Sequence, residues 1–212
     1  MDFLRPRHYN ITVQGEDEGV QALPPPSGYS SPGYLNNSPG YLMKGNYSSP
    51  GYLLRGDLAR HPTVKIFCRA NPNYSLSIRD GSVVLAPTDP KDQYQHWIKD
   101  MRYSTKVQDE EGYPAFALVN KATGEAIKHS FGQSHPVGLV PYNPDCLDES
   151  VLWTESRDVG RGFRCIRMVN NIYLNFDAFH GDKDHGGVRD GTTVVLWKWC
   201  KGDNQSWKIA PY

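Results

Sequence analysis

The sequence lacks an excess of charge of either sign. Its 212 residues include 23 Lys and Arg and 23 Asp and Glu. The balance also holds locally, because residues 1–61 carry five of each sign. A basic surface that would attract a phosphate backbone or an anionic membrane is therefore not expected, and a nucleic-acid partner is disfavoured.

The sequence also lacks long apolar runs. None is long enough to span a bilayer, and the first twenty residues contain no apolar stretch typical of a secretory signal, so we expect no membrane insertion and no export. No CxxC spacing occurs either, which indicates free thiols rather than a metal or redox site. We expect a protein of the cytoplasm and nucleus, since a 23.9 kDa chain can diffuse between them. The four cysteines are Cys68, Cys146, Cys165 and Cys200.

Residues 1–61 are dominated by a short tandem repeat. The unit Ser-Pro-Gly-Tyr-Leu occurs at 31–35, 38–42 and 49–53. Pro-Gly steps favour turns, and so little apolar surface cannot offset the entropy of ordering a chain, so the pattern predicts a disordered arm. The arm is interpreted either as a solubilising spacer or as a segment whose Tyr, Leu and Ser-Pro groups engage a protein partner or a kinase.

Residues 62–212 contain short β-branched and aromatic runs separated by turn residues, with no long helix, which is typical of an all-β domain. Three copies of one unit of about 50 residues are recognisable. Three such copies of four short strands each can close a barrel capped by three hairpins, which predicts a β-trefoil. The repeated positions are Ile66, Phe116 and Ile166; Leu85, Leu139 and Leu196; and the closing Trp97, Trp153 and Trp207, expected to be core residues.

The third copy differs from the others in a way that indicates a binding site. There, Trp197 follows the strand leucine, and Asn204 and Gln205 precede the closing Trp. A sugar ring has an apolar face that stacks on an aromatic plane and a rim of hydroxyls that amides and carboxylates can bind. The corresponding residues are Ala86, Tyr94 and Gln95 in the first copy and Val140, Ser150 and Val151 in the second.

The neighbouring strand offers two more polar candidates. Strand alternation predicts that Leu174 and Phe176 point into the core, so Asn175 and Asp177 would both face solvent and could bind adjacent hydroxyls. A charge-assisted bond from Asp177 would be the stronger of the two.

These residues carry a family resemblance. The endings Gln95-His96-Trp97 and Gln205-Ser206-Trp207 resemble the ricin B type of β-trefoil lectin. The segments ANPNYSLSIRDG, LNFDAFHGD and VRDGTTVVLWKWCKGDNQSWKI are similar to the Euonymus-related lectins of plants. The resemblance covers residues 62–212. It implies a non-catalytic lectin of the nucleus and cytoplasm that binds mannose- or galactose-containing glycans in abiotic stress responses.

The resemblance also implies a set of ligand residues. The aromatic platform falls on Trp197 and the amide pair on Asn204 and Gln205. Strict register puts Asn175 in the place of the acid, with Asp177 two residues further; we favour Asp177 and keep Asn175 as a second ligand. Phe179 and His180 are expected at the rim, and Trp199 is the rival stacking residue.

Other functions remain as alternatives. The segment from His180 to His185 has two His and two Asp, but its glycines suggest a loose loop, so no metal or other cofactor is expected. A glycosidase would need a carboxyl with a raised pKa, which is not expected for Asp177, Asp182 or Asp184 in an exposed loop. A protein-binding adaptor is the principal alternative to glycan binding, because a fold does not fix a function.

Overall fold

The computed structural model describes residues 56–212, so the predicted arm's repeats lie outside the described residues. In this part of the chain each copy supplies four strands. The first contains β1 (Val64–Cys68), β2 (Tyr74–Arg79), β3 (Ser82–Pro87) and β4 (Trp97–Asp100); the second β5 (Phe116–Asn120), β6 (Glu125–Lys128), β7 (Gly138–Pro141) and β8 (Leu152–Glu155); the third β9 (Ile166–Met168), β10 (Asn171–Ala178), β11 (Thr192–Lys198) and β12 (Trp207–Pro211).

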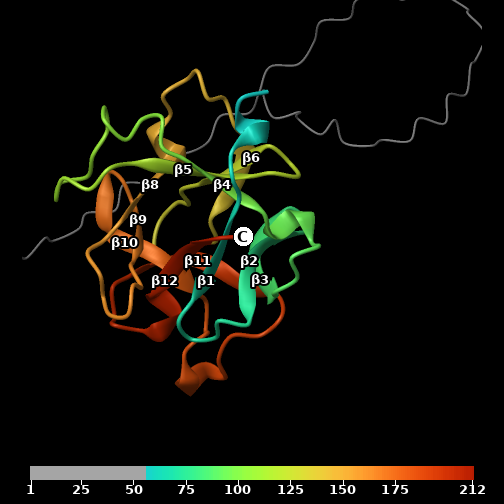
Figure 1. Ribbon diagram of the computed structural model, residues 1–212. Helices are drawn as coiled ribbons and strands as arrows, with labels where there is room; N and C mark the ends of the chain where they lie inside the picture. The colour runs from blue at the N-terminus through green and yellow to red at the C-terminus, as the bar shows by residue number, and fades with distance from the viewer. Residues whose placement is uncertain (1–55) are drawn as a thin grey trace, which may run out of the picture. The chain divides into compact units, whose positions relative to one another are not determined.

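The first and last strands of each copy form a barrel (Figure 1). They pair antiparallel in the order β12–β1–β4–β5–β8–β9, and a bridge between Arg164 and Trp207 brings the end of this series back to β12. The middle strands form three hairpins, β2–β3, β6–β7 and β10–β11. These meet where β11 pairs with β3 and where Pro136 bridges to Val195. The expected all-β class and β-trefoil architecture are confirmed. No helix among the described residues could cross a membrane.

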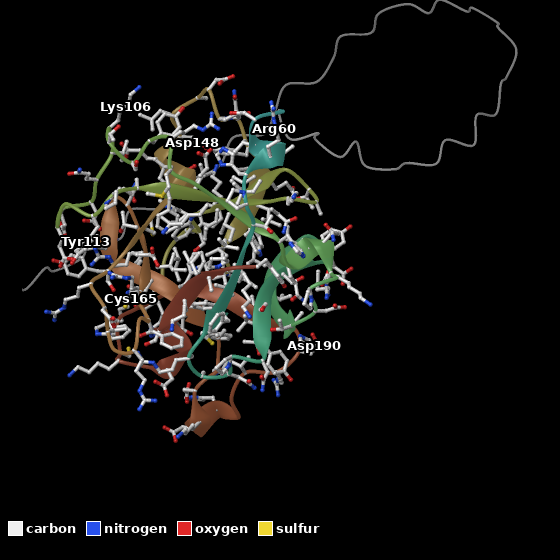
Figure 2. All side chains as sticks on the ribbon, viewed as in Figure 1. Arg60, Lys106, Tyr113, Asp148, Cys165 and Asp190 are labelled. Atoms are coloured by element: carbon white, nitrogen blue, oxygen red, sulfur yellow. The ribbon has the colours of Figure 1, made fainter. Side chains whose placement is uncertain are left out.

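The closing tryptophans fill the centre of the fold. Trp97, Trp153 and Trp207 are at most 1 % exposed. Each indole Nε1 donates to a carbonyl on the first strand of its own hairpin, at 2.9, 3.0 and 3.0 Å, which satisfies the polar atom that burial would otherwise leave unpaired. Figure 2 shows the dense packing of side chains inside the ring of strands. The accepting carbonyls belong to Leu76, Ile127 and Phe176.

A one-turn 3-10 helix precedes each closing tryptophan. These helices are η2 (Gln93–Gln95), η3 (Glu149–Val151) and η5 (Asp203–Gln205). In the first two copies an aspartate, Asp92 or Asp148, caps the turn by accepting a backbone N–H. Gly202 stands at the same place in the third copy and provides no such cap. The fold is therefore repeated, and the third copy departs from it just before its tryptophan.

Candidate functional site

The three indole bonds fix which residues are equivalent between copies. The residues that follow the accepting carbonyls are Ser77, Lys128 and Asp177. Each pairs across its hairpin with the residue before the strand leucine, namely Val84, Gly138 or Val195. The two criteria agree, so Asp177 is the residue of the third copy that replaces a serine and a lysine.

Asp177 and Asn204 are joined in the structure. Both side chains are nearly buried, at 7 % and 6 % exposure. The Asn204 amide Nδ2 donates to Asp177 Oδ1 at 3.0 Å and to the carbonyl of Ala178 at 3.2 Å. With both amide hydrogens engaged, the orientation of the Asn204 amide is fixed.

The Asp177 carboxyl has a raised pKa. Burial raises the pKa from 3.8 to about 6, although hydrogen bonds from the Gln205 and Asn204 amides act in the opposite direction, and Asp182 raises the pKa further. The expectation that no carboxyl here would have a raised pKa is wrong, because Asp177 lies on β10 and not in the exposed loop that follows. At neutral pH the group is ionised at the expense of stability, which is common for residues at functional sites.

Gln205 ties the site to the backbone. Its Nε2 donates to the carbonyl of Lys198 at 2.8 Å, and its Oε1 accepts from Cys200 N–H at 2.7 Å. Gln95 makes the same pair of bonds in the first copy, to Pro87 O and from Asp89 N–H. Gln205 therefore links η5 to the end of β11. Its side chain also lines the cavity described next.

A cavity of about 520 Å³ opens beside these residues, a volume common for small-molecule sites. Trp197, half-buried on β11, forms one part of its wall. Phe179 forms another, with its ring centroid 6.2 Å from that of Trp197 and the planes tilted by 42°. Six of the eight residues expected from the sequence meet here. The lining comprises Asp177, Phe179, His180, Asp182, Asp184, His185, Trp197, Cys200, Gly202, Asn204 and Gln205.

Two expected ligands lie elsewhere. Asn175 is only 1 % exposed, and its amide donates to the carbonyls of Tyr173 and Trp197. The expectation that it faces solvent is wrong, because its amide is turned to backbone carbonyls of β10 and β11 instead. Trp199 is 39 % exposed but is absent from the cavity lining. Trp197 is therefore the aromatic residue placed to stack a ligand beside Asp177.

Gly202 is a site residue that the sequence reasoning missed. A Cβ there would collide with Asn204 Oδ1. The aspartates at this position in the other copies are thus incompatible with the Asn204 conformation that contacts Asp177. Comparing Asp92, Asp148 and Gly202 across the repeats could have revealed this signal.

The corresponding positions in the first copy are occupied by an ion pair. Arg79 Nη2 lies 2.7 Å from Asp92 Oδ2, and its Nη1 donates to Ser77 Oγ at 3.0 Å. Ala86 stands in the position of Trp197 and offers no aromatic plane. The polar groups of this copy are thus engaged with one another.

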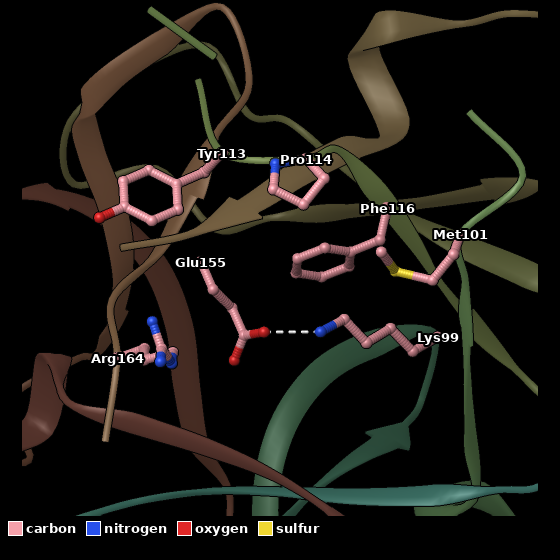
Figure 3. A pocket seen from close by; sticks show the side chains of 7 residues that line it. All are labelled: Lys99, Met101, Tyr113, Pro114, Phe116, Glu155 and Arg164. Atoms are coloured by element: carbon pink, nitrogen blue, oxygen red, sulfur yellow. Dashed lines mark hydrogen bonds and ion pairs between the residues drawn. The ribbon is translucent and has the colours of Figure 1, made fainter. Parts of the chain in front are cut away.

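A smaller cavity of about 150 Å³ lies between the barrel strands β4, β5 and β8 (Figure 3). Lys99 Nζ pairs with Glu155 Oε2 at 2.6 Å and lies 4.4 Å from the centroid of the Phe116 ring. The lysine is therefore already partnered, and the cavity has none of the paired amide and carboxylate of the third copy. The other lining residues are Met101, Tyr113, Pro114 and Arg164.

The cysteines are free thiols in the structure, as expected: Cys68 and Cys165 are buried and Cys146 and Cys200 exposed. Residues 56–212 contain no group of three or more His, Cys, Asp or Glu side chains placed to hold a metal ion. The only side-chain ion pair within the 180–185 loop joins His185 Nδ1 to Asp182 at 2.8 Å.

Comparison with known proteins identifies the family. The chain is 72% identical over 180 residues to the ricin B-like lectin R40G3 of Oryza sativa subsp. japonica, an alignment that covers 82% of this chain and 88% of the relative. The chain belongs to the ricin B-like lectins. The expected resemblance to ricin B-type and Euonymus-related lectins is confirmed, and the protein is a non-enzymatic member of this lectin group. No protein-family model matches the chain.

Two further comparisons concern a relative that aligns with nearly the whole chain and a solved structure with the same fold. The ricin B-like lectin EULS3 of Arabidopsis thaliana is 67% identical over 210 residues, which are 99% of this chain and 65% of that lectin. Among solved structures, the ricin B-like lectin of Macrolepiota procera in complex with lactose matches with a TM-score of 0.51 at 20% identity, over 70% of this chain and 94% of that one. At this identity the likeness supports the fold alone.

Proposed function

We propose that the protein recognises mannose- or galactose-containing glycans at the cavity of its third copy. The observation that carries the proposal is the Asp177–Asn204 pair beside the Trp197 plane. The carboxylate and the amide would bind neighbouring hydroxyls while the indole covers the apolar face of the ring. Few atoms are buried in such an open site, so a monosaccharide should bind with a Kd of about 10 µM to 1 mM.

A glycan array with matched variants tests the proposal. Trp197→Ala should abolish glycan binding, because the stacking plane is lost. Trp199→Ala removes an equally large aromatic group outside the cavity and should bind as the wild type does. Thermal melting of both variants checks that they are folded. A loss confined to Trp199→Ala would refute the assignment. If the wild type binds no glycan on the array but captures a protein partner, the adaptor function would be favoured.

Thiol labelling gives an independent test within one molecule. Cys200 is exposed and lines the cavity, whereas Cys146 is exposed on a different loop. A bound sugar should slow alkylation of Cys200 and leave the rate at Cys146 unchanged. Equal protection of both cysteines, or of neither, in the presence of saturating sugar would contradict the site.

We propose further that the protein acts in the nucleus and cytoplasm and in responses to abiotic stress. The sequon Asn204-Gln205-Ser206 supports this location, because a glycan on Asn204 would displace its bonds to Asp177 and Ala178. Mass spectrometry of native protein should find Asn204 unmodified, and cell fractionation should recover the protein from both compartments. Loss-of-function plants should differ from the wild type in survival under drought or salt.

A further inference from the structure

The loop after Asp177 is longer than its counterparts. The cross-strand partners Asp177 and Val195 are eighteen positions apart, whereas Ser77 and Val84 are seven apart. In the second copy the corresponding separation, between Lys128 and Gly138, is ten. The added residues form part of the cavity wall, so the extension occurs on the copy that carries the site. It is the orange-red loop at the lower edge of Figure 1.

This loop has a defined internal structure. Asp182 caps the 3-10 helix η4 (Lys183–His185) by accepting the N–H groups of Asp184 and His185, and it also pairs with the His185 ring. Gly187 N–H donates to Asp182 O at 2.8 Å, which closes the turn. These hydrogen bonds order the loop, so the expectation that it is loose is wrong.

The base of the loop is held close to the hairpin. A Cβ at Gly181 would lie 2.8 Å from the carbonyl of Ala178 and 2.9 Å from Val188. His180, just before it, has a positive φ of 57°, which is uncommon for a non-glycine residue. The glycine and this backbone geometry position the Phe179 and His180 rings beside the cavity.

Phe179 and Trp197 form a continuous aromatic surface. Two parallel planes that both contact one ring must be about 7–8 Å apart, because each carbon–carbon contact takes about 3.5–4 Å. The Phe179 and Trp197 centroids are only 6.2 Å apart and their planes are tilted. They cannot enclose a single sugar ring between them, but each can contact one of two linked rings.

The part of the cavity under this loop is acidic. Asp182 and Asp184 line it together with Asp177, and no Lys or Arg is among the lining residues. Arg189 lines a separate cavity of about 160 Å³, which shares only Phe179 and His180 with this one. A negatively charged ligand group here would meet the carboxylates of Asp177, Asp182 and Asp184.

From these observations we propose that Phe179, His180 and the η4 loop form a second sugar subsite, which contacts the ring linked to the sugar on Trp197 and accepts only uncharged or positively charged rings. This inference rests on the proposed glycan binding at Trp197. It extends that function by defining the ligand as an oligosaccharide without an acidic group on its second ring.

Paired monosaccharides and disaccharides test the second subsite. Isothermal titration with galactose and lactose, and with mannose and α1,2-mannobiose, should give about three- to tenfold tighter binding of the preferred sugar's disaccharide. Phe179→Ala should reduce the ratio of disaccharide to monosaccharide affinity to near one, whereas Trp197→Ala should weaken the binding of both ligands. A ratio of one in the wild type, or one unaffected by Phe179→Ala, would overturn the subsite and leave the Trp197 site intact. Failure of every monosaccharide to bind would instead refute the proposed function and, with it, this extension.

A matched disaccharide series tests the charge preference. The second ring carries hydroxymethyl, carboxylate or aminomethyl at C5. The carboxylate should bind about three- to tenfold more weakly than the neutral form, the amine at least equally well, and the gap should narrow in about 1 M salt, where the Debye length is about 3 Å. Asp184→Asn should also reduce the difference in affinity between the carboxylate and the neutral disaccharide. Tighter binding of the carboxylate would overturn the proposal and would point to Arg189 instead.

Discussion

Replacing Asp177 by Asn should stabilise the protein at neutral pH while weakening glycan binding. A carboxyl whose pKa is higher in the folded than in the unfolded state stabilises the protein below the unfolded value, and this contribution is lost as pH rises through the folded value. For Asp177 that window runs from 3.8 to about 6. Each pKa unit corresponds to about 1.4 kcal/mol, so ionisation of the buried group costs up to about 3 kcal/mol above pH 6. An amide of the same shape cannot ionise and avoids this cost.

Thermal and urea unfolding of wild type and variant between pH 4 and pH 8 measure the effect. For a domain of this size, about 3 kcal/mol corresponds to a rise of roughly 6–12 °C in Tm at pH 7.5, and the difference should vanish near pH 4. Asp148→Asn is the control, because hydrogen bonds from Ser150 hold the pKa of that carboxyl below its ordinary value. Its destabilising effect should instead be present at neutral pH and fade in acid.

The same series can be followed by glycan binding. Because Asp177→Asn loses a charge-assisted hydrogen bond, its glycan affinity should be about tenfold or more below that of the wild type. The wild-type affinity should also fall as the pH drops below about 6, whereas that of the variant should stay level. A stability difference between variant and wild type that does not depend on pH, or a variant less stable at every pH, would refute the account of the buried carboxylate.

Three further predictions follow from the packing of individual side chains. Gly202→Ala should displace Asn204 and reduce glycan affinity about tenfold with little loss of Tm, whereas Gly138→Ala, where a Cβ meets only an ordinary contact at 3.9 Å, should change neither; equal affinities in a binding titration would contradict the packing argument. Gln205→Ala and Gln95→Ala should each cost about 1–3 kcal/mol in urea unfolding, because each removes a pair of backbone bonds, yet only Gln205→Ala should also weaken binding. Arg167→Ala should cost about 3–5 kcal/mol in the same assay, since it leaves the buried Asp109 carboxylate without its ion-pair partner at 2.5 Å; a loss below 1 kcal/mol would count against that reasoning.

The sequence was sufficient to predict the architecture because the fold depends on repeated features. Three tryptophans at near-equal spacing indicated a threefold barrel, and their indole bonds explain why that spacing is kept. The difference between the third copy and the other two also indicated where the cavity lies, since Trp197, Asn204 and Gln205 all line it.

The details that the sequence could not supply depend on three-dimensional packing. Strand alternation alone made Asn175 and Asp177 equivalent, but both are buried, and of the two Asp177 contacts Asn204. The raised pKa of Asp177 follows from that burial, and the pattern of residue types alone does not predict it. Likewise, the loop glycines suggested mobility, whereas the cap formed by Asp182 organises the segment.

The ion pair of Arg79 and Asp92 in the first copy has a consequence for valency. The first copy has Ala86 at the position of Trp197 and an ion pair beside it, and the second copy has Val140 at the position of Trp197 and Lys128 at that of Asp177. A trefoil with one such site can hold a glycan but cannot bridge two of them. Agglutination of glycan-coated particles by the described domain would therefore require that two chains associate or that two domains be joined in tandem.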